Sequence, residues 1–96
     1  MDKAILKEIG LTEYESIIYL ALLKNGQLSA YVLAKKIGFY RQVTYDALNR
    51  LVEKGFVSSV KEGKPQLYKA IDPQLILEYI NEKTEHLEFA LSALNS

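Results

Sequence analysis

Cysteine and tryptophan are absent from this chain of 96 residues, and it contains a single histidine. The lack of thiols excludes disulfides, cysteine-based zinc sites and thiolate nucleophiles, and one histidine supports neither a histidine metal cage nor most catalytic triads. No pair of carboxylates, nucleophile with a base, or phosphate-binding glycine loop occurs at a usable spacing. The sequence therefore predicts a protein that is not an enzyme and that needs no cofactor or metal.

Long hydrophobic runs are missing as well. The longest apolar run, residues 17–23, is far shorter than the roughly 20 residues that cross a bilayer. The first residues alternate charged and aliphatic side chains, unlike a secretory leader. Hydrophobic residues make up 49% of the chain and charged residues 25%, which is typical of a globular domain. We therefore expect a single cytoplasmic domain with no membrane partner.

The formal net charge is zero, but the charges are segregated along the chain. Residues 1–23 contain two Lys against four acids, residues 24–69 contain nine Lys or Arg against three acids, and residues 70–96 contain one Lys against five acids. The three segments therefore carry −2, +6 and −4. A local positive field of this kind attracts the phosphates of a nucleic acid. The middle of the chain is the predicted place for such contacts.

Three helices are predicted in the first forty residues, because polar capping residues precede each apolar pattern and glycines follow it. The caps are Asp2, Thr12 and Ser29, and the glycines are Gly10, Gly26 and Gly38. Glu15 lies three residues after Thr12 and completes a capping box. The second helix is apolar on every side, so we expect it at the centre of the fold.

A fourth helix, residues 41–54, follows the short turn of residues 38–40. Helical spacing places one stripe of side chains inward, namely Thr44, Ala47, Leu48 and Leu51. The opposite side carries Gln42, Tyr45, Asp46 and Asn49, which packing does not explain. Two helices joined by a short turn that contains glycine predict a helix-turn-helix.

Residues 56–61 and 66–71 are rich in β-branched and aromatic side chains and flank a turn, so they predict a β-hairpin with Lys61 and Lys64 near its tip. A hairpin directly after a helix-turn-helix predicts a wing. The expected fold class is mainly α with a small β-hairpin (α+β), a winged helix-turn-helix. Residues 1–72 form the DNA-binding domain, and residues 73–96 form a C-terminal dimerisation helix in the same compact unit.

The last helix carries an apolar stripe that extends beyond any surface that a domain ending near residue 71 could cover. We expect this stripe to pair two copies of the chain in a parallel or antiparallel seam. The predicted dimerisation residues are Ile76, Ile80, Leu87, Leu91 and Leu94. Alternatively, the helix folds back over residues 17–23 of its own chain.

Four segments carry a resemblance to a known family: LKEIGLTEYESIIYLALLKNG, LSAYVLAKKIGF, VTYDALNRLVEKGFV and GKPQLYKAIDP. Over residues 6–80 the chain resembles the DNA-binding domain of the TrmB-like family of archaeal transcriptional regulators. The resemblance implies promoter binding as a dimer through the helix that matches residues 41–54. Larger members add a C-terminal sugar-sensing domain that the matched segments do not include, so a small-molecule effector is left unknown.

The predicted DNA-binding residues lie on the fourth helix, next to it and on the wing: Ser29, Tyr40, Arg41, Gln42, Val43, Tyr45, Asn49, Lys61 and Lys64. Arg41 and Gln42 are expected to read guanine and adenine edges, although Arg41 is also suited to hold a phosphate. Val43 either touches a thymine methyl group or fills the edge of the domain. Tyr40 lies near the phosphates or packs inward.

The predicted function is that of a sequence-specific transcriptional regulator, which binds double-stranded DNA as a homodimer on a palindromic promoter site. The alternative is a winged-helix adaptor that binds other proteins without reading DNA, because this fold supports both uses. An adaptor would present an apolar or acidic face on the helix of residues 41–54. Here that face is polar with basic neighbours, which favours DNA.

Overall fold

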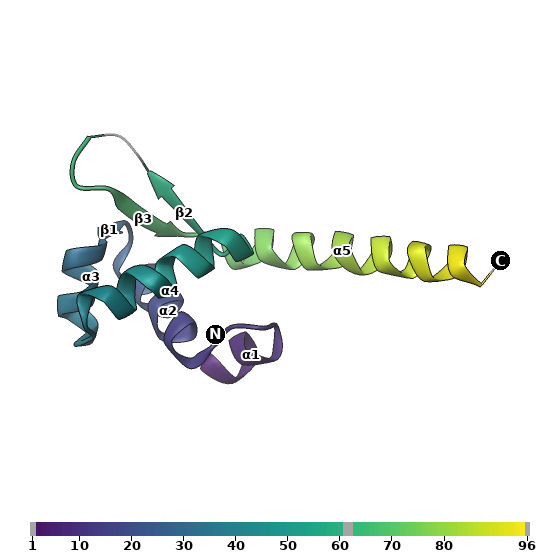
Figure 1. Cartoon of the computed structure of the whole chain (residues 1–96), viewed down its shortest axis with the longest axis horizontal. Helices are drawn as coiled ribbons and strands as arrows, with labels where there is room; N and C mark the ends of the chain where they lie inside the picture. Colours follow the sequence, from purple (N-terminus) through teal and green to yellow (C-terminus); the bar gives the residue numbers. More distant parts are fainter. Residues whose placement is uncertain (1, 61–62, 96) are drawn as a thin grey trace.

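The computed structural model describes residues 2–60 and 63–95. The described elements, in chain order, are α1 (Lys3–Glu8), α2 (Glu13–Asn25), β1 (Leu28–Ser29), α3 (Ala30–Ile37), α4 (Arg41–Lys54), β2 (Val57–Val60), β3 (Leu67–Ala70) and α5 (Pro73–Leu94). Helices α1 to α4 gather into one body, the hairpin projects from it, and α5 leaves it as a long straight arm (Figure 1). The protein therefore measures 53 × 30 × 22 Å along its principal axes.

The predicted helix caps are all formed. The Asp2 carboxylate accepts the Ile5 N–H at 3.1 Å, and the Ser29 hydroxyl accepts the Val32 N–H at 3.2 Å. At the start of α2, Thr12 and Glu15 form the reciprocal capping box, with distances of 3.2 and 2.9 Å. Each cap gives a partner to backbone N–H groups that the first turn of a helix leaves unpaired.

Helix α2 lies at the centre of the fold, as its apolar character on all sides predicts. It packs against α1, α3, α4 and β3, and the side chains of Ile18, Tyr19 and Leu22 are buried. The inward stripe predicted for α4 is confirmed, because Thr44, Ala47, Leu48 and Leu51 are all fully buried. One side of α4 is thus fixed by the core, and the orientation of its other side follows from this packing.

The sheet contains three strands among the described residues, where the sequence predicted a hairpin of two. Strands β2 and β3 form that hairpin, with Val57 opposite Ala70 and Val60 opposite Leu67. Strand β1 is the addition: Leu28 pairs with Tyr68 and Ser29 with Leu67, both antiparallel, which gives the order β1-β3-β2. A strand of two residues has no period to read. Its pairing ties the hairpin to the start of α3.

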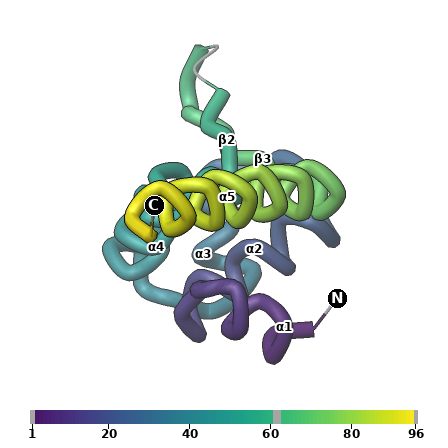
Figure 2. The backbone as a smooth tube through the Cα atoms, turned by 90° about the vertical axis from the view of Figure 1, so that its right-hand side faces the viewer, coloured from purple at the N-terminus to yellow at the C-terminus, as the bar shows by residue number. Residues whose placement is uncertain are grey.

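Helix α5 starts at the edge of the core and then leaves it (Figures 1 and 2). The fold-back over residues 17–23 is therefore wrong. Ile76, predicted for the dimer seam, is instead only 6% exposed and belongs to the chain's own core, and Ile80 packs partly against the same cluster. The first turns of α5 lie against the body, so the beginning of the stripe is used within the chain. No described helix combines the length and apolarity needed to cross a membrane.

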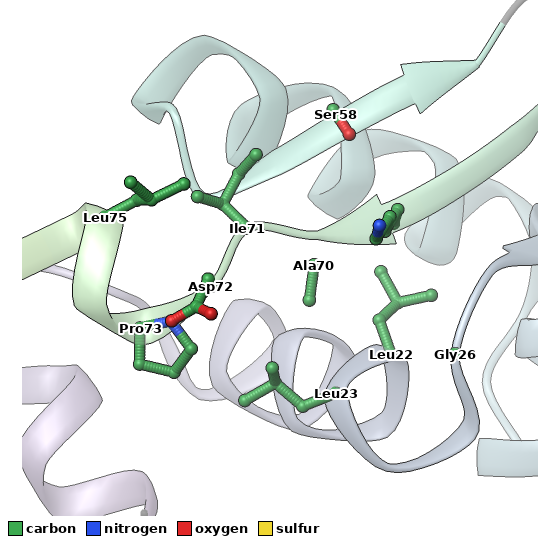
Figure 3. Close-up of a pocket in the computed structure, with 10 residues that line it drawn as sticks. Leu22, Leu23, Gly26, Ser58, Ala70, Ile71, Asp72, Pro73 and Leu75 are labelled. Atoms are coloured by element: carbon green, nitrogen blue, oxygen red, sulfur yellow. The ribbon is translucent and has the colours of Figure 1, made fainter.

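The junction between the body and α5 is held by a buried tyrosine. The Tyr19 hydroxyl on α2 donates to the Ile71 carbonyl oxygen at 2.7 Å, just before α5. Burial, followed by the charge of Asp72, raises the pKa of Tyr19 to about 12. An open hollow of about 430 Å³ lies beside this junction, with walls from α2, β3 and the start of α5 (Figure 3). None of the predicted DNA-binding residues lines it.

Candidate nucleic-acid interface

The first turns of α4 form an exposed polar surface. Arg41, Gln42 and Asn49 are exposed, while the opposite side of the helix is buried in the core. Tyr40, the residue before the helix, is 85% exposed, so its ring does not pack inward. It also provides no side-chain cap for the helix. The surface therefore consists of a helix start without a side-chain cap and of exposed side chains that can form hydrogen bonds.

Two pairs of side chains, each one helical turn apart, order this surface. The Arg41 guanidinium lies 5.8 Å from the centre of the Tyr45 ring, a cation–π distance. The Gln42 amide nitrogen donates to the Asp46 carboxylate at 2.9 Å. Residues four apart on a helix are neighbours on its surface. Both side chains expected to read bases are thus held by partners on the same helix.

Tyr45 differs from its predicted position on the fully exposed side. It is half-buried and packs partly against the core cluster. Burial raises the pKa of the neighbouring Tyr68, and Tyr45 adds to this effect. The Tyr45 ring is therefore a fixed support for Arg41, and a direct contact of Tyr45 with DNA stays a prediction.

Val43 lies at the border between this surface and the body. It is half-buried and lines a shallow hollow of about 170 Å³ together with Tyr14, Phe39 and Tyr40. The rings of Tyr14 and Phe39 meet edge to face at 4.9 Å and form one wall of it. This position is compatible with both readings of Val43, the filling of the domain edge and a contact with a methyl group.

Ser29 is predicted to bind DNA, but in the structure it stabilises the fold. Its side chain is only 7% exposed, its hydroxyl caps α3, and its backbone pairs with Leu67 in the sheet. A DNA contact by Ser29 stays a prediction, and the interface proposed below does not include it.

The wing stands away from the body (Figure 2). Lys64 is exposed near its tip, and Lys69 is exposed on β3. Lys61, the other lysine predicted to bind there, lies outside the described residues. The wing therefore presents positive charge at a second place, separated from the start of α4.

The opposite end of α4 is held by a buried acid that sequence reasoning did not connect to it. Glu15 is fully buried, and its carboxylate accepts hydrogen bonds from Arg50 Nε at 2.8 Å and Lys54 Nζ at 2.6 Å. Burial alone would raise the pKa of Glu15, but the hydrogen bonds from Lys54, the Thr12 N–H and Arg50 outweigh it and lower the pKa below 4.5. Two of the basic residues counted above, Arg50 and Lys54, are thus paired with a buried acid of the same chain.

The remaining cations mark where the positive field lies. Within residues 2–60 and 63–95, six basic side chains of the middle segment form no ion pair, namely Lys24, Lys35, Lys36, Arg41, Lys64 and Lys69. Lys24 lies at the end of α2, and the other five belong to the end of α3, the start of α4 and the wing. The free positive charge of the end of α3 and the start of α4 therefore lies at the exposed start of α4, the wing carries further positive charge, and the cations at the end of α4 are paired with Glu15.

Comparison with known proteins gives this arrangement a family. A relative from Pyrococcus furiosus, the HTH-type sugar sensing transcriptional regulator TrmBL1, is 44% identical over 80% of the chain. A second, from Thermococcus kodakarensis, the DNA-binding HTH-type transcriptional repressor TrmBL2, is 34% identical over 97% of it. The chain spans only 22% and 35% of these two proteins.

A solved structure shows the same architecture. It is described as the structure of TrmBL2, an archaeal chromatin protein that shows a novel mode of DNA binding. It is 30% identical, with a TM-score of 0.81 over 95% of this chain and 35% of that chain. The family model described as the sugar-specific transcriptional regulator TrmB matches residues 6–74. The match covers most of the winged helix described above, and the chain belongs to the TrmB family.

Proposed function

We propose that the chain binds double-stranded DNA sequence-specifically and regulates transcription, as a homodimer on a palindromic promoter site. The observation that carries the proposal is the start of α4, where Arg41 and Gln42 are exposed while the buried stripe fixes the helix from behind. An α-helix fits the major groove of B-DNA, where each base pair presents a distinct pattern of donors and acceptors.

The surrounding charge supports this orientation. Phosphate contacts place a protein on the duplex, and contacts to base edges select the sequence. The unpaired cations at the end of α3 and on the wing, among them Lys36 and Lys64, are exposed and suit phosphates. A protein-binding adaptor would present an apolar or acidic helix face instead, and Asp46 is the only acid in the first two turns of α4.

The C-terminal helix supports pairing of two copies. Leu87, Leu91 and Leu94 share one side of α5, and all three are exposed along an arm that no other described part of the chain covers. Burying each such side chain is worth about 1.5–3 kcal/mol. Residues 1–72 then act as the DNA-binding domain and residues 73–96 as the pairing helix. Two recognition helices about 34 Å apart reach successive major grooves on one face of the duplex.

The proposed function needs no cofactor, and it places the protein in the cytoplasm with the DNA. The sugar response named for one relative belongs to a protein of which this chain matches 22%. No residue described here is assigned to a sugar or any other effector.

The test is a selection of bound fragments from random duplex DNA at near-physiological salt, followed by gel shifts on the selected sites. An inverted repeat is the expected result, and Gln42→Ala should lose base preference at one position of each half-site. Glu82→Gln, on the exposed part of α5, is the control and should select the same motif. Absence of any enriched motif, with folded protein, would overturn the proposal.

A further inference from the structure

Gln42 and Asp46 form a pair whose chemistry allows one orientation. The Gln42 Nε2 donates to Asp46 Oδ1 at 2.9 Å on the exposed side of α4. An ionised carboxylate only accepts hydrogen bonds, whereas one end of an amide donates and the other accepts. A reversed amide would bring its oxygen against the carboxylate oxygen. The partner therefore determines which way the amide faces.

The hydrogen bond leaves part of the amide free. One N–H of Nε2 is used by Asp46, and the second N–H and the Oε1 oxygen remain. These two groups lie side by side in the plane of the amide, as one donor and one acceptor. Adenine presents the complementary pair in the major groove, the N7 acceptor and the N6 donor, whereas guanine presents two acceptors.

Asp46 has no other task that the structure shows. Its side chain is exposed, so it contributes nothing to the core, and it forms no ion pair with a described cation. It also places a negative charge within the positive surface that would face the phosphates, which weakens binding to any DNA sequence. Asp46 thus weakens DNA binding and does not stabilise the fold, which points to a role in selectivity.

We propose that Asp46 is a positioning residue that determines specificity: it fixes the Gln42 amide so that Gln42 reads adenine and rejects guanine. The proposal rests on the DNA-binding function proposed above. With Asp46 in place, Oε1 faces the position of the guanine O6 oxygen, and two acceptors repel each other. Without it, the amide turns freely and offers its N–H groups to guanine, so the penalty against the wrong base disappears.

Arg41 shows why the effect is particular to Gln42. Its partner, the Tyr45 ring, holds the guanidinium by its charge. A guanidinium has donors only, so the position of Arg41 changes its reach but not the kind of base edge that it matches. Of the two ordered pairs on α4, only Gln42 with Asp46 contains a choice between donor and acceptor.

The test compares the base preferences of purified wild-type protein and four variants by selection from random duplexes and competition gel shifts. The variants are Asp46→Ala, Asp46→Glu, Gln42→Ala and the double variant with alanine at both positions. The wild type should prefer adenine over guanine at one position of each half-site by about 5- to 150-fold. Asp46→Ala should reduce that preference at least about fivefold and strengthen binding to random DNA, while Asp46→Glu, also an acceptor-only carboxylate, should retain it.

The double variant separates positioning from direct reading. If Asp46 acts through Gln42, its removal changes no base preference when Gln42 is already alanine. A change in that background would show that Asp46 contacts a base itself and would overturn the inference. An unchanged adenine preference in Asp46→Ala would overturn it too, while the selected motif would leave the proposed function standing. A wild-type protein that selects no motif would instead overturn the proposed function.

Discussion

Glu15 Oε2 accepts a hydrogen bond from Arg50 Nε at 2.8 Å, although the two residues are 35 positions apart in the chain. The carboxylate belongs to the first turn of α2, and the guanidinium belongs to the last part of α4. Lys54, one turn after Arg50, donates to the other oxygen of the same carboxylate. The central helix therefore fastens α4 at the end opposite to its exposed start.

Replacing Glu15 should be among the most damaging single changes in this domain. Glu15→Ala removes a capping-box partner and leaves two cations unpaired, but Arg50 and Lys54 are partly exposed and water can solvate them. We expect a loss of about 2–3 kcal/mol in the free energy of unfolding, below the 3–5 typical of fully buried pairs. Urea unfolding measures it. Glu15→Gln keeps the acceptor for Thr12 and should lose less; an equal loss would show that charge alone matters.

Acid should destabilise the protein through its carboxylates on α2. Hydrogen bonds from Lys7 and Lys3 lower the pKa of Glu13 to about 2, and Glu15 is also lowered. A carboxylate with a lowered pKa in the folded state stabilises fully above its unfolded pKa near 4.5, and this contribution disappears as the pH falls through the folded pKa. The melting temperature should therefore fall between about pH 4.5 and 2. Glu13→Gln should show a shallower fall, and an identical curve would contradict this assignment.

High pH should lower the free energy of unfolding through ionisation of Tyr19. Its pKa of about 12 in the folded protein exceeds the ordinary value of 10.0, so the stability it provides is complete below pH 10 and disappears as the pH rises toward 12. Tyr19→Phe should cost about 1 kcal/mol at neutral pH through the lost hydrogen bond to Ile71. It should also flatten the unfolding free energy above pH 10 relative to wild type. Tyr14→Phe, at a half-exposed ring, is the control and should leave both measurements unchanged.

The salt dependence of DNA affinity should show whether the wing contacts phosphates. A dimer that neutralises about six phosphates should show a slope near −5 when log affinity is plotted against log salt concentration. Lys64→Ala removes one contact in each protomer and should make the slope shallower by about 2, with equal losses on specific and random DNA. Lys24→Ala removes the same charge at the end of α2 and should leave the slope unchanged. Equal effects of both variants would show a general charge effect instead of a contact.

Pairing through α5 should depend on its exposed apolar side. Leu91→Gln should shift the dimer toward monomer in sedimentation experiments and weaken binding to the inverted repeat more than to a single half-site. Glu85→Gln introduces the same side chain on the opposite side of the same helix and should leave the dimer intact. Dimers of unchanged stability in Leu91→Gln would exclude this stripe as the seam.

Much of the fold could be predicted because its determinants are local. The caps at Asp2, Thr12 and Ser29 depend on residues three positions away, and the inward stripe of α4 depends on helical spacing alone. Strand β1 could not be read, since its pairing partner lies about forty residues further along the chain. Ile76 was assigned to the seam because periodicity shows which side of a helix is apolar, and not which body covers it.

The sequence likewise predicts some features of the candidate site and not others. The exposure of Arg41 and Gln42 follows from the helical period, whereas the hydrogen bond from Gln42 to Asp46 needs side-chain conformations that a pattern does not contain. Glu15 was recognised as a cap, but its pairing with Arg50 and Lys54 was not predicted. A charged residue on the buried side of an otherwise apolar helix was the available signal, because such a charge requires a partner.

The junction at Tyr19 and Ile76 has a consequence for the spacing of the proposed operator. α5 leaves the body beside the hydrogen bond from Tyr19 to Ile71 and the buried side chain of Ile76, so these contacts restrict bending between the body and the helix. In the proposed dimer, two such units would hold the recognition helices at a fixed separation. If the proposed dimer binds this way, a promoter with one base pair inserted between the half-sites keeps every base that the protein reads, and we expect it to be bound more weakly because the two helices are held at the old separation.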